Sequence, residues 1–409
     1  MHSSEIAVLG AGVVGLSVAL RLADEGHAVT LIAPEDRGDG ASYGNAGVIA
    51  DYAVLPVGTP DVLRNLPSLL FDRLSPLAIR RSAVLSLLPW LTRFALQSLP
   101  GPARRNARAI AALLADAAAE WRDQADRIGG SDVLRRRGSL YLYESAADIS
   151  EASLQWQRDL GVQVERLGRD ELGQLEPGLP GEAAVGAAYF PNTMTVSDPG
   201  RMLRLLAAAV PGAGVARITA RATGLERGAN GVIIRCDDGT HLCARRVVLA
   251  AGAWSRPLAR MAGDRVPLDT ERGYHIEFDM EEQPITRQMT PVSRGFYFCP
   301  MEGRLRVAGT VELGGLGAPA SPHRVAVLEE GARAVLPDLP AISRSWMGCR
   351  PSLPDSVPVI GPSRAGDDVI HAYGHGHLGL TLAPVTARMV ADLVAGRGGV
   401  AAPYLPSRF

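Results

Sequence analysis

The chain contains 409 residues, of which 47% are hydrophobic and 21% are charged. These fractions are typical of soluble globular proteins and exclude a disordered or fibrous chain. The 42 basic residues nearly balance the 43 acidic ones, and the formal charge of −1 argues against a nucleic-acid-binding protein. At about 100–200 residues per domain, this length predicts two or three domains.

The first predicted elements form a strand–helix–strand pattern. Ile6–Leu9 is a short apolar run that ends at a glycine, as buried strands often do. Val13–Glu25 has apolar residues at helical spacing and stops at Gly26, a good helix terminator. Ala28–Ile32 is a second apolar strand. Together these segments predict a βαβ unit.

Ala83–Leu99 is the most apolar long stretch of the chain. It contains Pro89 and Arg93, and it is short for a membrane span, which needs about 20 apolar residues. We interpret it as an amphipathic or buried helical hairpin that packs in the core. Contact with a membrane surface is the alternative interpretation.

The remainder of the chain has a mixed pattern. It predicts helices at 103–127, 150–160 and 199–210, and strands at 139–143, 218–225, 232–236 and 241–249. Two further groups, 274–278 and 296–311, have the pattern of antiparallel strands. The last elements are a strand at Val369–Ala372, a glycine–histidine turn and an apolar helix at Leu382–Val394. Because strand–glycine–helix units stand at both ends, we predict an α/β nucleotide-binding domain built from distant segments, with a second, α+β domain inserted between them.

Four cysteines, at positions 236, 243, 299 and 349, lack the CxxC spacing of zinc sites. Their scatter also argues against a disulfide framework, so we expect no metal and a reducing, cytoplasmic setting. The N-terminal Met1–Glu5 has no basic region typical of a secretory signal, and we predict no cleaved leader.

A GxGxxG motif directly follows the first predicted strand and opens the first predicted helix. The first glycine permits the tight turn, the second lets backbone approach a pyrophosphate, and the third allows close packing of helix on strand. The helix N-terminus adds free N–H groups and the positive end of its dipole. A dinucleotide site is therefore predicted at Gly10, Ala11, Gly12, Val13, Val14 and Gly15.

An acidic residue that binds the ribose hydroxyls is expected about 20 residues beyond such a motif. Glu35 lies 20 residues after Gly15 and is the candidate. The usual place, directly at the strand end, is occupied by Ala33, so we expect a shifted contact. A solvated loop carboxylate is the alternative for Glu35.

Arg246–Ser255 is an apolar strand that runs into small residues, which would let backbone pass close to a flavin nucleotide. At this point the sequence resembles the family of FAD-dependent amine and D-amino-acid oxidoreductases, which includes D-amino-acid dehydrogenases, glycine oxidase and sarcosine oxidase. The likeness is greatest to bacterial D-amino-acid dehydrogenases, including the branch that acts on D-proline and hydroxy-D-proline. Its matching segments are the N-terminal βαβ unit and residues 41–47, 249–254, 271–275, 309–312, 350–355 and 374–379.

The resemblance implies a Rossmann-like FAD-binding domain and non-covalent FAD. Some relatives attach the flavin through a cysteine, and the corresponding position here is Gly348, next to Cys349. The loop near the reactive edge of the flavin would contain Ser42, Gly44, Asn45, Ala46 and Gly47. Further contacts to the cofactor would come from Ala222, at the adenine, and from Ala251, Gly252 and Trp254.

The glycine–histidine turn precedes the last predicted helix. Its N–H groups and helix dipole would stabilise negative charge at the N1/C2=O end of the reduced flavin. The resemblance implies cofactor contacts at Gly374, Gly376, His377, Leu378 and Gly379. His375 would line the pocket. Because solvent can deprotonate the substrate amine, no general base is required.

An amino-acid substrate needs a group that binds its carboxylate, and a guanidinium does so with two parallel hydrogen bonds. Arg350 and Arg272 are the candidates, with Tyr274 supplying a hydroxyl. Glu312 is a candidate for the amine or a ring hydroxyl. A structural salt bridge or a core tyrosine is the alternative role for these residues.

These assignments predict oxidation of a small D-amino acid or a cyclic secondary amino acid of the D-proline or 4-hydroxy-D-proline type, with hydride passing from the α-carbon to flavin N5. The electron acceptor would be a quinone, another carrier or O₂, and the lack of an assignable oxygen-activating lysine favours a dehydrogenase. The alternatives are a glycine- or sarcosine-type oxidase, a flavin subunit of a hetero-oligomeric dehydrogenase, and a flavoprotein acting on modified tRNA. Balanced charge argues against the last of these and against nucleic-acid partners in general.

We expect residues 1–50, 195–265 and 345–409 to form the FAD-binding domain, and residues 51–194 and 266–344 to bind substrate. A cytoplasmic protein is expected, with attachment to the inner membrane face and oligomerisation left open.

Overall fold

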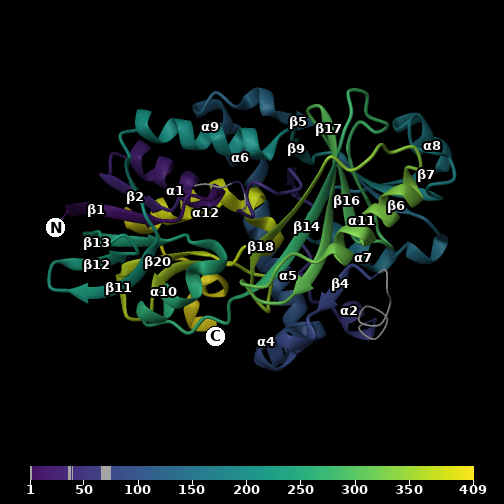
Figure 1. Ribbon diagram of the computed structural model, residues 1–409. Helices are drawn as coiled ribbons and strands as arrows, with labels where there is room; N and C mark the ends of the chain where they lie inside the picture. The colour runs from purple at the N-terminus through teal and green to yellow at the C-terminus, as the bar shows by residue number, and fades with distance from the viewer. Residues whose placement is uncertain (1, 36–37, 39, 66–74) are drawn as a thin grey trace.

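The computed structural model describes residues 2–35, 38, 40–65 and 75–409 (Figure 1). Its strands form three sheets. An eight-stranded sheet lies at the end of the molecule that contains the N-terminus, and a nine-stranded sheet extends across the other end (Figure 1).

The eight-stranded sheet collects segments from both ends of the chain and from its middle. Strands β10, β2, β1, β13 and β20 run parallel, whereas β12, β11 and β19 pair antiparallel. In sheet order they are β10 (Ala216–Thr219), β2 (Val29–Ala33), β1 (His2–Leu9), β13 (His241–Leu249), β12 (Gly231–Cys236) and β11 (Ala222–Gly228), with β20 (Gly366–Tyr373) on β13 and β19 (Val359–Ser363) on β20. The predicted assembly from distant segments is therefore confirmed.

The nine-stranded sheet is mixed. Its order is β18 (Arg344–Ser352), β14 (Asp269–Asp279), β17 (Arg304–Leu313), β16 (Phe296–Met301), β15 (Gln288–Pro291), β6 (Ser139–Tyr143), β8 (Gly186–Phe190) and β7 (Glu165–Gly168), with β4 (Leu77–Ile79) on β17. The third sheet contains β3 (Val48–Ile49), β9 (Met194–Val196) and β5 (Leu134–Arg136). Strand β18 belongs to the nine-stranded sheet, whereas residues 345–409 are predicted to belong to the FAD-binding domain. The domain boundaries stay a prediction.

Two helices from opposite ends of the chain lie side by side on the eight-stranded sheet. α1 (Val13–Asp24) contacts α12 (Gly379–Val394) as well as β1, β2 and β20. α6 (Ala117–Arg127) packs against α12, and the indole N–H of its Trp121 donates to the Leu380 carbonyl at 2.8 Å. The other α-helices are α2 (Pro60–Arg64), α4 (Val84–Gln97), α5 (Pro100–Leu114), α6 (Ala117–Arg127), α7 (Glu151–Asp159), α8 (Arg169–Leu175), α9 (Pro199–Gly212), α10 (Ser255–Met261) and α11 (Pro322–Val335).

Three predicted elements differ from the structure. The strand expected at 218–225 is two strands, β10 and β11. The first pairs with β2 and the second with β12, at opposite ends of the strand order. The helix expected at 103–127 is divided into α5 and α6. The hairpin expected at 83–99 is one helix, α4, and only its Leu87 and Trp90 are buried, so core packing does not explain its composition.

Among the described residues, every helix falls short of the length and apolarity that a bilayer crossing requires.

Candidate active site

The glycine turn between β1 and α1 is built from backbone packed on backbone. Gly10 has φ +111°, and a Cβ added at Gly15 would lie 1.8 Å from the Gly10 carbonyl oxygen. The N-cap residue of α1 is Gly12, which has no side chain to cap the first N–H groups. The helix end is therefore shaped to receive an anionic group against backbone, as a dinucleotide pyrophosphate requires.

The predicted flavin loop at 41–47 is held between this turn and the nine-stranded sheet. The Val13 N–H donates to Ser42 Oγ at 3.0 Å. On the other side, His275 Nδ1 donates to the Gly44 carbonyl at 3.0 Å, and the Arg306 guanidinium donates to the Asn45 carbonyl. Arg306 is in turn fixed by Glu277, 2.7 Å away. The loop thus connects the dinucleotide turn to one particular face of the sheet.

That face can be followed by strand register. β14 pairs antiparallel with β18, and Glu271 lies opposite Arg350, whereas Arg272 lies opposite Cys349. Because successive side chains of a strand point to opposite faces, Arg350 shares the face of Glu271 and His275. Arg272 is on the other face. The two arginines predicted to bind one carboxylate are thus separated by the sheet.

Arg350 is partly accessible and lies over the backbone of β14. A Cβ added at Gly273 would approach its guanidinium carbon to 2.4 Å, so only glycine leaves room for it there. One Arg350 nitrogen donates to the Thr310 carbonyl at 3.3 Å, and no acidic side chain of the described chain forms an ion pair with it. Burial lowers the pKa of Arg350, while nearby Glu271 and Tyr297 oppose that shift. The guanidinium is thus partly accessible and forms no ion pair among the described residues, although Glu271 lies opposite it on β14.

Arg272 has a different environment. Its side chain is fully buried, with Nη1 2.9 Å from Glu312 Oε2 and Nη2 donating to the Ala318 carbonyl at 2.6 Å. The Tyr274 hydroxyl donates to the same Glu312 oxygen at 2.6 Å, and Arg80 pairs with Glu312 Oε1 at 3.0 Å. Arg272, Tyr274 and Glu312 therefore form a buried cluster on the far face, which favours a structural role for them.

The two histidines of the last turn are also separated. His375 is buried, and its Nε2 lies 2.9 Å from the hydroxyl of Thr386 inside α12. His377 is partly accessible; burial, together with the charge of Arg350, lowers its pKa to about 4. His377, and not His375, is thus the histidine on the side of Arg350.

The burial of His375 gives a pH-dependent contribution to stability. Burial lowers its pKa to about 4, compared with about 6.5 in an unfolded chain, so between these values the unfolded state binds more protons. The contribution is complete above pH 6.5 and is lost as pH falls towards 4, at about 1.4 kcal/mol per pH unit. We expect wild type to lose about 2 kcal/mol more unfolding free energy than His375→Gln between pH 7 and 5. Urea titrations measure the unfolding free energy of both proteins at each pH. Equal losses in wild type and His375→Gln between pH 7 and 5 would contradict this prediction.

The remaining predicted cofactor residues surround the carboxyl ends of the parallel strands. Glu35 is exposed, two residues beyond the end of β2, and its ribose contact stays a prediction. Ala222 begins β11, and Ala251, Gly252 and Trp254 follow β13, with Trp254 exposed. Ligands of open α/β sheets bind at this edge.

Our sequence reasoning did not single out Glu271 and Tyr297. Tyr297 lies in β16 opposite Ala308, which pairs with His275, so it shares the face of Arg350. The alternation of β16 could have indicated Tyr297. Phe296 and Phe298 are buried in the core, so the residue between them, Tyr297, points to the opposite face of the sheet. Only the register of four strands brings it next to Arg350.

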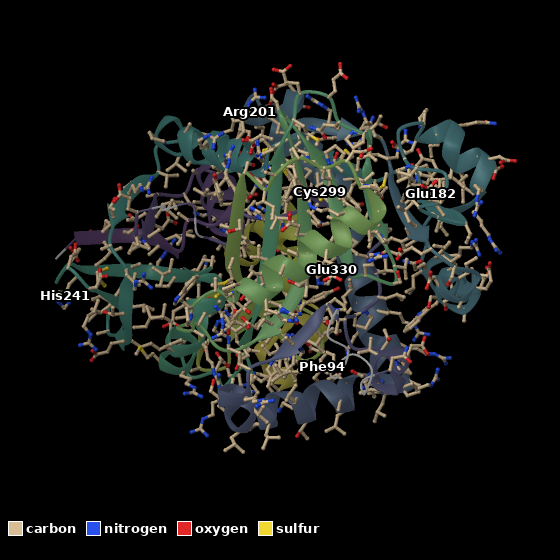
Figure 2. All side chains as sticks on the ribbon, turned by 45° about the vertical axis from the view of Figure 1, so that its right-hand side comes forward. Phe94, Glu182, Arg201, His241, Cys299 and Glu330 are labelled. Atoms are coloured by element: carbon tan, nitrogen blue, oxygen red, sulfur yellow. The ribbon has the colours of Figure 1, made fainter. Side chains whose placement is uncertain are left out.

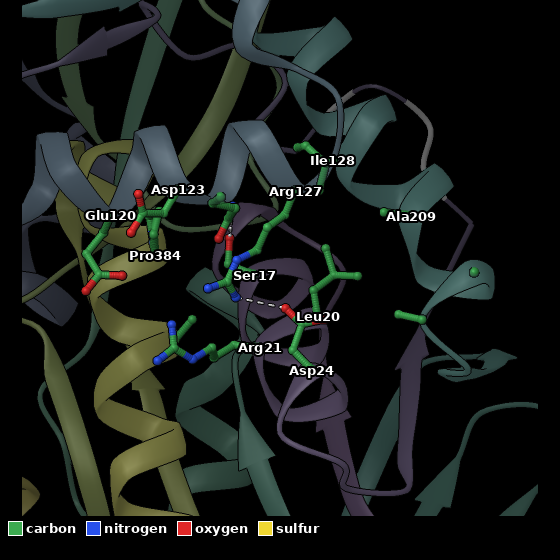
Figure 3. A pocket seen from close by; sticks show the side chains of 14 residues that line it. Ser17, Leu20, Arg21, Asp24, Glu120, Asp123, Arg127, Ile128, Ala209 and Pro384 are labelled. Carbon is green, nitrogen blue, oxygen red and sulfur yellow. Dashed lines mark hydrogen bonds and ion pairs between the residues drawn. The ribbon is translucent and has the colours of Figure 1, made fainter.

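An open groove of about 370 Å³ lies elsewhere, between α1, α6, α9 and α12 (Figure 3). Two of its charged side chains, Arg127 and Asp24, pair with each other at 3.0 Å. Neither the glycine turn nor Arg350 lines it, so we assign it no catalytic role. Within the described residues, no cluster of His, Cys, Asp or Glu side chains is arranged to hold a metal ion.

A family model described as "FAD dependent oxidoreductase" matches residues 5–393. The chain belongs to this family. The FAD-dependent oxidoreductase is 34% identical to a D-amino-acid oxidase of Bradyrhizobium diazoefficiens, over 99% of this chain and 98% of that protein. It is 35% identical to D-amino acid dehydrogenase 2 of Ralstonia nicotianae, over 99% of this chain and 100% of that protein.

Solved structures confirm the fold of this FAD-dependent oxidoreductase. Glycine oxidase from Geobacillus kaustophilus superposes with a TM-score of 0.79 at 24% identity, with all of both chains covered. L-proline dehydrogenase from P. horikoshii superposes with a TM-score of 0.76 at 20% identity, over 100% of this chain and 98% of that chain. The protein is thus an enzyme that uses FAD, and the crowded glycine turn at 10–15 suits the pyrophosphate of that cofactor.

Proposed function

We propose that this enzyme oxidises the CH–N bond of a small D-amino acid or cyclic secondary amino acid, of the D-proline or 4-hydroxy-D-proline type. The observation that carries the proposal is Arg350, a partly accessible guanidinium that forms no ion pair among the described residues, on the sheet face that holds the loop at 41–47. Glu271 lies opposite it at some distance, so the forked N–H groups of Arg350 are available to a substrate carboxylate. The names of the two curated relatives agree with a D-amino-acid substrate.

Arg350 binds the carboxylate through its forked N–H groups, and its hydrogen bond to the Thr310 carbonyl fixes the plane of the guanidinium. Tyr297 and His377 lie within the electrostatic reach of Arg350. With a pKa of about 4, His377 is neutral at pH 7 and does not repel a substrate ammonium. These groups orient the α-carbon towards the loop at 41–47.

FAD, when bound, supplies the two-electron acceptor for the hydride that leaves the α-carbon. The substrate amine loses a proton to solvent beforehand, and the organic product is an imine. Water hydrolyses an open-chain imine to an oxo acid and ammonia, whereas a cyclic substrate yields a pyrroline carboxylate. We further propose that FAD is held non-covalently, because Cys349 points to the face of β18 opposite to Arg350.

We propose a quinone or another carrier, in preference to O₂, as the second electron acceptor. The relatives include proteins named oxidase and dehydrogenase at almost the same identity, so the names alone do not decide between acceptors. Peroxide formed under air, compared with the rate of reduction of an artificial quinone, distinguishes the two.

Anaerobic bleaching of the yellow holoenzyme tests the substrate class. The panel contains D- and L-proline, 4-hydroxy-D-proline, D-alanine, glycine and sarcosine, with propylamine as a substrate analogue that lacks the carboxylate. We expect rapid bleaching by small D-amino acids or cyclic D-imino acids and at least a hundredfold slower bleaching by propylamine, since about 3 kcal/mol of carboxylate binding is lost. Bleaching only by L-amino acids, or equally by propylamine, would contradict the proposal.

A further inference from the structure

The helix α4 has an apolar stripe on its outer side. Leu85, Leu88 and Leu96 are exposed by 81%, 48% and 56%. Their spacing places them on one helical face, whereas Leu87 and Trp90 turn inwards and pack on Leu313 of β17. Figure 2 shows Phe94 of this helix at the lower edge of the molecule, with side chains of α4 extending outward. Continuous exposure of this kind marks an interaction surface.

The charged residues of α4 and of the chain segments on either side of it have one sign. Between residues 75 and 115 the sequence contains six arginines and no aspartate or glutamate, although the whole chain is nearly neutral. Arg80 pairs with Glu312. The other five are Arg81, Arg93, Arg104, Arg105 and Arg108, all exposed, and none forms an ion pair within the described part of the chain.

We propose that α4 and these five arginines form a surface that adsorbs to an anionic lipid bilayer. Exposed leucines enter the acyl boundary while arginines contact lipid phosphates, which is the pattern of helices that lie in the membrane interface. The helix has 14 residues and contains Pro89, so it lies on the bilayer and does not cross it.

The surface is closely linked to the proposed substrate site. Val311 packs against the inner side of α4, and the adjacent Thr310 carbonyl holds Arg350. The other end of α4 contacts the segment that follows the loop at 41–47, since a Cβ added at Gly58 would meet Ser98 at 2.3 Å. Adsorption through α4 therefore places the flavin region next to the bilayer, where a lipid-dissolved electron acceptor is available. This role of the surface rests on the proposed function.

Co-sedimentation of the holoenzyme with vesicles tests the proposal. Vesicles of phosphatidylglycerol and phosphatidylcholine are compared with vesicles of phosphatidylcholine alone. We expect binding to the anionic vesicles, which Leu85→Ser/Leu88→Ser/Leu96→Ser weakens at least tenfold. Arg104→Gln/Arg105→Gln/Arg108→Gln should weaken it about a hundredfold, because each arginine near an anionic surface contributes roughly a factor of five.

The control substitutions lie outside α4 and α5. Val185→Ser/Val292→Ser removes exposed apolar side chains, and Arg136→Gln/Arg158→Gln/Arg169→Gln removes the same number of exposed charges. Both controls should bind as wild type does. Equal binding to uncharged vesicles, equal losses in the controls, or a dimer in solution that the leucine variant dissociates would each overturn the proposal. Anaerobic bleaching by amino acids needs no vesicle, so its success without vesicle binding would refute only the membrane surface.

Discussion

Replacing Arg350 by leucine should lower kcat/KM for an amino-acid substrate by roughly a hundred- to a thousandfold, mainly through KM. The substitution removes a charge-assisted, two-point contact in a partly desolvated site, where losing one partner costs about 3–4 kcal/mol. Arg350→Lys keeps the charge but not the fork, so we expect an intermediate loss. Steady-state kinetics with an artificial electron acceptor measure both variants.

Arg272→Leu is the matched control for this experiment. It removes a guanidinium from the neighbouring strand, but from the opposite sheet face, where Arg272 pairs with buried Glu312. Breaking that pair should cost about 3 kcal/mol of stability and lower Tm, while the KM of the folded enzyme stays near that of wild type. A normal KM in Arg350→Leu together with a raised KM in Arg272→Leu would move the carboxylate site to the far face.

Gly15→Ala should yield a folded protein that retains little FAD. The added Cβ would lie 1.8 Å from the Gly10 carbonyl oxygen, so α1 must move away from the turn that faces the pyrophosphate. A displacement of this kind costs at least about 1.5 kcal/mol, and FAD affinity should fall tenfold or more. The ratio of absorbance at 450 and 280 nm after gel filtration measures the loss, and far-ultraviolet circular dichroism reports folding.

Gly212→Ala separates this effect from a general effect of adding a methyl group to a helix. Gly212 lies in α9, and a Cβ there would have no atom within 4 Å. Its FAD content should match that of wild type. If Gly15→Ala also kept full FAD content, the glycine turn would not be the pyrophosphate site.

Local patterns in the sequence were sufficient for the dinucleotide turn and the general architecture, and the resemblance to a known family added FAD. The motif at 10–15, between an apolar strand and an amphipathic helix, predicted the βαβ unit that the structure contains. The strand–turn–helix at the chain end predicted β20 and α12, which join that unit in one sheet and one helical layer. Such patterns are visible in sequence because tight turns and helix periodicity depend on residues that are neighbours in the chain.

The site near Arg350 depended on register between strands far apart in sequence. Arg272 and Arg350 lie on adjacent strands, yet shifting their pairing by one residue would have placed both on one face. Tyr297 joins Arg350 only through the pairing of β16 with β17 and of β17 with β14. The exposure of α4 also depended on distant parts of the chain. Its apolar residues could have been covered by other elements or faced outward, and in the structure only Leu87 and Trp90 are buried.

The amino-acid sequence by itself determined that this chain folds around a dinucleotide turn and belongs with flavin-dependent oxidoreductases. Only the tertiary structure decided which guanidinium is accessible beside the loop at 41–47, which histidine is enclosed in the core, and which leucines remain uncovered. The physical reason is that helix periodicity and turn geometry are local properties, whereas burial and sheet face depend on partners contributed by distant parts of the chain.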